Sequence, residues 1–135
     1  MKTVLLGICC LFLAVVPCLA NDIDNRAIAA ARSFTEIVDE GNFQAAYWFA
    51  APLLRLANAE QLWTESTARS QRVLGKVLDR KLKRIKAVSS PPGLPDDDYR
   101  IILFDALTEY KAAAAEVILL HQVAGLWQVC SYSIR

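Results

Sequence analysis

The sequence is poor in the residues from which most catalytic and metal sites are built. It contains one histidine, His121, and four cysteines among 135 residues. Three of these cysteines lie within the first 18 residues, which leaves Cys130 as the only later thiol. One histidine and one thiol are too few for a zinc site of the usual composition. The chain also lacks a glycine-rich phosphate loop, a G-x-S-x-G elbow and an H-E-x-x-H helix. We therefore predict no metal and no cofactor.

An excess of charge of one sign is also absent. The chain has 15 lysines and arginines against 14 aspartates and glutamates. Proteins that bind nucleic acid usually carry a clear basic excess, so we expect no nucleic-acid partner. Glycine is scarce, with 5 residues, while 55% of the chain is hydrophobic, and this combination is typical of a folded domain.

The N-terminus has the pattern of an export signal. Lys2 is followed by an apolar run from Val4 to Val16 and then by Pro17-Cys-Leu-Ala20, which ends in small residues. This order is typical of a secretory signal peptide cleaved after Ala20, and the apolar run is too short for an ordinary membrane span of roughly 20 residues. We predict a signal peptide at 1–20 and a single domain at 21–135, periplasmic or secreted and without a transmembrane segment. An uncleaved anchor is the alternative.

The first half of the mature chain has helical patterning. Apolar residues at helical spacing predict a helix that has a small-residue face and ends at Gly41; they are Ala27, Ala30, Ala31, Phe34, Ile37 and Val38. Asn42 is a good N-cap for a second helix, which Pro52 interrupts. Asn58, with Gln61 three residues later, resembles a capping box that begins a third helix.

The second half is patterned for strands. Residues 80–88 fit either a helix or a polar edge strand, and residues 89–98 are a loop because three prolines and a glycine interrupt hydrogen bonding. Residues 99–107 are apolar on both faces, as in a buried strand, and Gly125 predicts a hairpin turn before a last strand at 126–134. The hairpin requires a partner strand immediately before it, so we interpret 115–122 as a strand despite the alanine run at 112–115.

Several of these segments together resemble a known family. In the second half they are Pro95-Asp-Asp-Asp-Tyr99, Phe104, Glu116-Val117, Gly125-Leu-Trp127-Gln-Val129 and Tyr132-Ser-Ile-Arg135; in the first half they are Ala30-Ala-Arg32, Val38-Asp-Glu-Gly41, Trp48, Ala51-Pro52, Trp63, Leu74-Gly75 and Arg80. The chain resembles the exported bacterial proteins of the domain of unknown function 4019 family. That resemblance implies a small envelope protein of unassigned activity. The order of helices and strands is also similar to the cone-shaped fold of SnoaL-type cyclases, ketosteroid isomerases and nuclear transport factor 2.

Few groups are candidates for chemistry. His121 with Asp105 or Glu116 is a candidate general base, and Tyr99, Tyr110 or Tyr132 a candidate hydrogen-bond donor to an oxyanion. The alternative is that His121 lies near a strand end without a chemical role, and that Asp105 faces solvent. Trp48, Trp63 and Trp127 are expected to be core anchors, and Trp63, Trp127 and Tyr110 are the candidates to line a ligand pocket.

A basic cluster precedes the proline-rich loop. It comprises Lys76, Arg80, Lys81, Lys83, Arg84 and Lys86. Lysines on an edge strand prevent edge-to-edge aggregation, which is the structural interpretation. The functional alternative is attraction to anionic lipid or to an acidic partner.

We predict an α+β protein in which three N-terminal helices pack on a curved antiparallel sheet of about four strands. Because the strands are apolar on both faces, the face without helices must be hidden by a homodimer interface or must bind a small apolar ligand. A non-enzymatic envelope binding or interaction module is the leading hypothesis. The alternatives are an isomerase, cyclase or dehydratase using acid–base chemistry in the cone, and electrostatic association with anionic lipid.

Overall fold

Residues 16–135 fold as four helices followed by a four-stranded antiparallel sheet. The computed structural model describes residues 16–135, and their side chains from residue 22 onward. The helices are α1 (Val16–Asp39), α2 (Phe43–Phe49), α3 (Pro52–Ala57) and α4 (Glu60–Leu74). The strands are β1 (Val77–Val88), β2 (Tyr99–Thr108), β3 (Ala114–Val123) and β4 (Leu126–Ile134), and they are neighbours in sequence order. The predicted α+β class and the four-stranded antiparallel sheet are confirmed.

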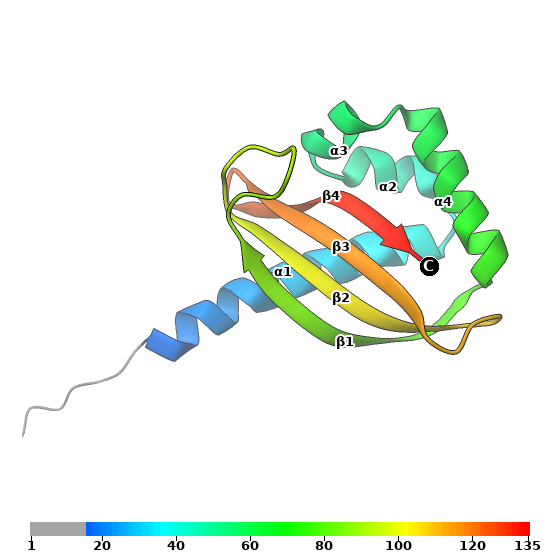
Figure 1. The fold of residues 1–135 in the computed structure, drawn as a ribbon, viewed down its shortest axis with the longest axis horizontal. Coiled ribbons are helices and arrows are strands. Elements are labelled where there is room, and N and C mark those ends of the chain that lie inside the picture. The colour runs from blue at the N-terminus through cyan, green and yellow to red at the C-terminus, as the bar shows by residue number, and fades with distance from the viewer. Residues whose placement is uncertain (1–15) are drawn as a thin grey trace, which may run out of the picture.

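The long helix α1 covers one face of the sheet, while α2, α3 and α4 gather beyond β4 (Figure 1). Its buried face carries Ala27, Ala31, Phe34 and Val38, at the spacing expected for an amphipathic helix. The two alanines are fully buried, so the helix backbone approaches the strands closely. The other face of the sheet faces the viewer in Figure 1, and no helix of residues 16–135 lies over β1, β2 and β3 on that face.

The described helices number four because Pro52 begins a helix and does not merely interrupt one. Proline is well placed at the first position of α3, where its missing N–H needs no partner. Asn42 caps α2 as predicted, since its side chain accepts a hydrogen bond from the Ala45 amide. The predicted capping box at Asn58 is wrong. Asn58 ends α3 and donates its side-chain N–H to the Leu54 carbonyl, while α4 begins after Ala59.

The strand assignments around the hairpin are confirmed. The alanine run leads directly into β3, and β3 pairs with β4 through a two-residue turn at Ala124 and Gly125. Both turn residues have positive φ angles, 49° and 81°. Two positive φ values are characteristic of a type I′ turn, whose twist matches that of the flanking strands.

The sequence 80–88 belongs to a strand, β1, which is the edge strand beside β2. A bulge interrupts its pairing, because Leu82 lies opposite Phe104 while Arg84 lies opposite Leu103. The extra residue, Lys83, reverses the alternation of faces for the rest of the strand. Side chains of opposite sequence parity therefore share a face on the two sides of the bulge.

The predicted signal peptide, residues 1–20, lies mostly outside the described residues and stays a prediction, as does the domain boundary at residue 21. Among the described residues, no helix is long and apolar enough to cross a membrane.

Candidate functional site

The space between the helices and the sheet is filled by side chains. Phe34 of α1 contacts Trp63 of α4 and Tyr132 of β4, with ring centroids 6.2 and 5.4 Å apart. Ile102, Phe104, Ile118 and Leu120 complete this core, and all four are fully buried. A cavity beside Asp39 and Tyr132 holds about 20 Å³, which is room for roughly one water molecule. This cavity is far too small for an organic substrate.

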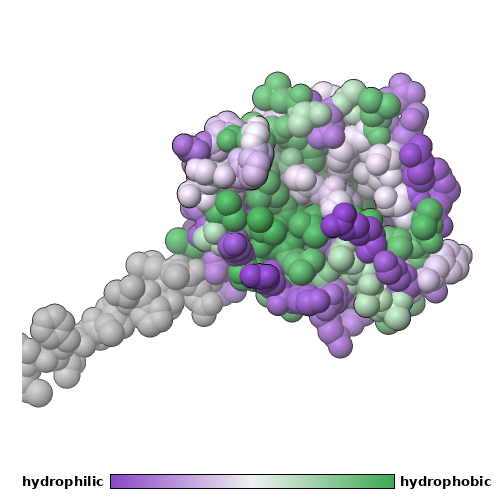
Figure 2. All heavy atoms as spheres, viewed as in Figure 1, coloured by the Kyte–Doolittle hydropathy of each residue, from purple (hydrophilic) through white to green (hydrophobic). Residues whose placement is uncertain are grey.

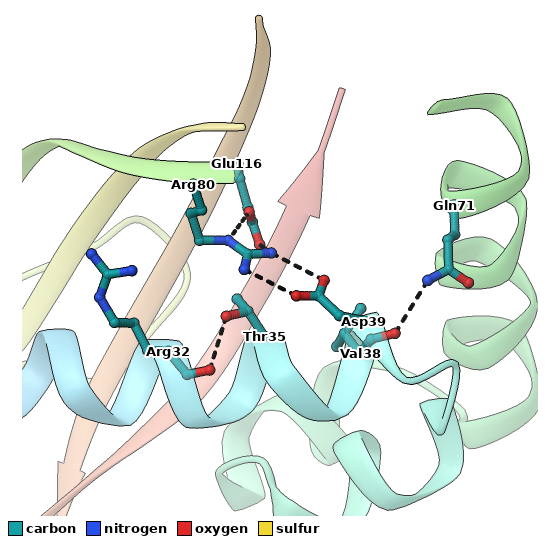
Figure 3. A network of polar contacts seen from close by, with 7 residues as sticks. All are labelled: Arg32, Thr35, Val38, Asp39, Gln71, Arg80 and Glu116. Carbon is teal, nitrogen blue, oxygen red and sulfur yellow. Dashed lines mark hydrogen bonds and ion pairs between the residues drawn. The ribbon is translucent and has the colours of Figure 1, made fainter. Parts of the chain in front are cut away.

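One charged group is buried in this core. Glu116 on β3 is fully buried and accepts two hydrogen bonds from Arg80 on β1, at 2.7 and 3.2 Å (Figure 3). Arg80 also donates two hydrogen bonds to Asp39 at the end of α1, at 3.0 and 3.1 Å. One guanidinium is thus shared by two carboxylates, and it ties the first helix to both strands.

In this cluster, burial and the ion pairs shift the pKa values of Arg80 and Glu116 in opposite directions. Burial raises the pKa of Glu116 above its ordinary value, while the Arg80 guanidinium acts in the opposite direction. Burial by itself would lower the pKa of Arg80, but its bonds to Asp39 and Glu116 raise it. Burial also raises the pKa of the Tyr132 hydroxyl well above the ordinary range, and the nearby Glu116 raises it further. Arg80 and the two carboxylates already have partners within the protein, so we interpret the cluster as structural.

The structure does not bring His121 together with Asp105 or Glu116, the partners predicted from the sequence. Glu116 points to the helix-covered face, whereas His121 lies opposite Tyr99 on the uncovered face. Asp105 is six residues from Tyr99 along β2, which separates it from His121 by roughly 20 Å at about 3.3 Å per residue. Asp105 shares a face with Ile101 and Leu103, but this is the uncovered face. Its side chain is 47% exposed, and its nearest cation is Lys83 at 3.6 Å.

His121 instead holds the proline-rich loop. Its Nε2 lies 2.8 Å from Asp97 Oδ2, and its ring stacks on Tyr99 with centroids 4.7 Å apart. Tyr99 is fully buried, and its hydroxyl donates to the Pro95 carbonyl at 2.8 Å. Burial raises the pKa of Tyr99. The His121 bond and the Asp98 amide lower the pKa of Asp97. These groups fasten the loop over one end of the uncovered face.

The ligand-pocket candidates are divided between core and surface. Trp63 and Trp127 are core residues, 7% and 8% exposed, whereas Trp48 is 59% exposed, so its prediction as a core anchor is wrong. Trp63 also lines a surface cleft of about 210 Å³ beside Tyr132. Tyr110 is 72% exposed and lines an open groove of about 470 Å³ with Val73 and Lys111. The three candidates do not meet in one pocket.

The uncovered face of the sheet combines apolar and basic side chains. Ile101, Leu103 and Val117 form the floor of a groove of about 220 Å³, and Arg84 and Lys86 line it on the β1 side. We call this the sheet groove. Figure 2, drawn from the same side as Figure 1, shows hydrophobic residues gathered over the central strands and hydrophilic ones along the β1 edge.

The β-bulge in β1 gathers the cations on this face. Lys81 lies opposite Asp105 before the bulge, and Arg84 and Lys86 lie opposite Leu103 and Ile101 after it. Their cross-strand partners all belong to the uncovered face, and Lys83 reaches Asp105 on the same face. We call these four side chains the cation row: Lys81, Lys83, Arg84 and Lys86. Simple alternation would have sent Lys81 and Arg84 to opposite faces.

The two remaining members of the predicted basic cluster lie elsewhere. Arg80 points to the helix-covered face, where it is held by Asp39 and Glu116. Lys76 precedes β1, and its backbone amide donates to Glu109. Among the described residues, no group of three or more histidine, cysteine or acidic side chains is arranged to hold a metal ion.

Comparison with known proteins assigns the chain to a family. The family model described as Protein of unknown function (DUF4019) matches residues 30–132, most of the chain. The chain belongs to this family. The DUF4019 match spans α2, α3, α4 and β1 to β3 in full, together with residues 30–39 of α1 and 126–132 of β4, so it includes all three residues of the Arg80 cluster. No curated protein and no solved structure matches the chain. The likeness to the cone-shaped SnoaL-type fold therefore stays a prediction.

Proposed function

We propose that the protein is an exported, non-enzymatic binding module and that the uncovered sheet face is its binding surface. The observation that carries this proposal is the contrast between the two faces of the sheet. On the helix side the space is filled by the core, whereas on the other side Ile101, Leu103 and Val117 are only partly buried and form a groove. Apolar groups gathered in an exposed groove are typical of interaction sites.

The proposal also accounts for the four cations beside the groove. Lysines on an edge strand oppose aggregation whichever face of the sheet they lie on. Protection against aggregation therefore does not explain why all four members of the cation row lie on one face. A row of like charges next to apolar residues selects partners that combine acidic and apolar groups. Export is supported by the pattern of the first 20 residues.

No observation favours the acid–base enzyme. Such a reaction requires a general base and a hydrogen-bond donor around one enclosed space. Asp105 and His121 lie far apart on the outer face, and the interior cavity has room for about one water molecule.

Cysteine accessibility in cells tests the proposal without knowledge of the partner. Ser133 lies opposite Val117 on the uncovered face and is exposed, so Ser133→Cys reports on that face. Ser33 is exposed on α1, and Ser33→Cys is the matched control. The native Cys130 gives little background, because burial raises the pKa of its thiol to about 11. The unsubstituted protein corrects for any labelling of the N-terminal cysteines.

A membrane-impermeant maleimide is applied to intact cells of the native host and to the purified protein. We expect both variants to react in the purified protein, and only Ser33→Cys to react fully in cells. Equal labelling of both variants in cells would show an unoccupied face and overturn the binding surface. Absence of labelling of both in cells would overturn export.

A further inference from the structure

We infer that the partner of the sheet face is an anionic lipid bilayer. The inference rests on the proposed function and names the chemistry of the partner. The cation row lies beside the apolar floor of the sheet groove. An interface with a bilayer needs two kinds of contact, cations at the level of the lipid headgroups and apolar side chains that reach past them.

The cation row meets the first requirement. Lys81, Arg84 and Lys86 are exposed and have no ion-pair partner among the described residues, while Lys83 is shared with Asp105. Three of the four members of the row are lysines, which are flexible point charges and suit a diffuse anionic surface better than a directed contact. Each such cation strengthens binding to an anionic membrane about fivefold.

The groove floor meets the second requirement. Ile101, Leu103 and Val117 present only hydrocarbon, so the floor has no polar group that would direct hydrogen bonds to a folded protein. Lysine and arginine side chains beside it have long apolar stems, which allows their charges to stay at headgroup level while the floor approaches the acyl chains. Ser131 and Ser133 lie on the far side of the floor and add no charge.

The acidic groups near this face have hydrogen-bond or ion-pair partners within the protein itself. Asp97 binds His121, and Asp98 pairs with Arg100. Asp96 accepts a hydrogen bond from Ser90 at 2.7 Å. A second copy of the chain would be a poorer occupant, because it would bring its own cation row to the same interface.

Vesicle binding by charge variants tests the inference. The protein purified from its envelope is mixed with vesicles of phosphatidylcholine alone, or of phosphatidylcholine and phosphatidylglycerol in equal amounts, and the bound fraction is measured by sedimentation. The test variant neutralises three members of the row, as Lys81→Gln with Arg84→Gln and Lys86→Gln. The control variant neutralises three exposed cations elsewhere, as Arg69→Gln with Arg72→Gln and Lys111→Gln.

We expect binding only to the anionic vesicles, and a loss of about 100-fold in the partition coefficient for the test variant. The control variant should lose no more than a few-fold. Both variants share one N-terminus, so any contribution of residues 1–20 cancels. Equal binding of the two variants, or equal binding to both kinds of vesicle, would overturn the inference.

The apolar floor is tested separately. Ile101→Thr with Val117→Thr keeps β-branched residues in both strands while removing hydrocarbon from the groove. Leu56→Gln removes an apolar side chain that is 83% exposed on α3 and serves as the control. We expect the threonine variant to lose binding that persists at high salt, and the control to retain it. Equal residual binding would show that the floor does not enter the bilayer.

The experiments can contradict the lipid bilayer as partner without contradicting the sheet face as binding surface. Protection of Ser133→Cys in cells without vesicle binding would overturn the lipid and leave the binding surface standing. Sedimentation equilibrium without vesicles distinguishes the second copy. A dimer that the threonine substitutions dissociate would replace the bilayer as the occupant.

Discussion

Arg80 and Glu116 form an ion pair across an intervening strand, with Nε 2.7 Å from Oε2. Arg80 belongs to β1 and Glu116 to β3, and β2 separates the two strands. The β2 residue opposite Arg80 is Ala106, which is fully buried and has only a methyl side chain. The small residue leaves space for the arginine to reach over β2, past the ring of Phe104, which lies 5.9 Å from its guanidinium carbon.

Removing one partner of this ion pair should destabilise the protein strongly. Arg80→Met leaves the fully buried Glu116 without its cation, and we expect a loss of about 3–5 kcal/mol in the free energy of unfolding. The double variant Arg80→Met with Glu116→Leu removes both charges and should recover most of that loss, because Asp39 is 31% exposed and can be hydrated. Urea denaturation measures the free energy of unfolding of both variants. A double variant as unstable as Arg80→Met would contradict the electrostatic explanation.

The same variant should show a characteristic pH dependence. Burial raises the pKa of Glu116, and this shift increases when Arg80 no longer opposes it. A carboxyl with a raised folded-state pKa favours folding below its unfolded pKa, and this contribution is lost as pH rises through the folded pKa. Arg80→Met should therefore recover stability, relative to the double variant, as pH falls from neutral toward the unfolded glutamate pKa near ~4.3. A difference in the free energy of unfolding between the two variants that does not change with pH would contradict the prediction.

The contribution of Asp97 to stability should depend on pH in the opposite direction, so that it is lost as pH falls. Its hydrogen bonds to His121 and to the Asp98 amide lower its pKa, so its contribution is present above the unfolded aspartate pKa and is lost as pH falls through the lower folded value. We expect Asp97→Asn to be less stable than the parent protein at neutral pH and equally stable in strong acid. Denaturation at both pH values measures this, and a difference that persists in acid would refute it.

Gly75 should tolerate alanine less well than Gly93 does. The φ angles are almost the same, 77° and 76°, so both substitutions carry similar backbone strain. A Cβ at Gly75 would lie 2.7 Å from the Cβ of Glu109, whereas nothing lies within 4 Å at Gly93. We expect Gly75→Ala to cost about 1–3 kcal/mol more than Gly93→Ala, through overpacking at the start of β1. Equal melting temperatures of the two variants would show that the contact relaxes freely.

A substitution in the β3–β4 turn should increase the stability of the protein. Ala124 has a φ of 49°, a conformation that strains alanine and that asparagine tolerates better. Ala124→Asn creates the Asn-Gly pair favoured in type I′ turns, and we expect a gain of about 0.5–1 kcal/mol. Thermal denaturation measures the gain. Ala124→Val serves as the control and should lower the melting temperature, because a β-branched residue adopts positive φ poorly.

The strands and the hairpin were predictable because their signals are local. Glycine after Ala124 marks the turn, and a turn of two residues requires the segment before it to pair with the segment after it. The pattern of Ala27, Ala31, Phe34 and Val38 similarly predicts the buried face of α1. These features depend on neighbours within a few residues.

The Arg80 cluster was not predictable in the same way. Arg80 appeared to be one more cation of a basic segment, and Glu116 appeared to be a candidate partner of His121. Asp39, Arg80 and Glu116 are 41 and 36 residues apart along the chain, and only the packing of α1 against the sheet brings them together. A weak signal was present in the sequence, since Glu116 stands among the apolar residues of a predicted strand.

The sequence by itself determined the α+β class, the hairpin and the apolar character of both sheet faces, because each follows from local order or composition. Tertiary structure decided which face stays uncovered and which cations lie on it. A one-residue bulge at Lys83 reverses the side-chain alternation of β1, so Lys81, Arg84 and Lys86 share the uncovered face while Arg80 enters the core. Strand register depends on pairing with β2, and pairing is a property of the folded sheet.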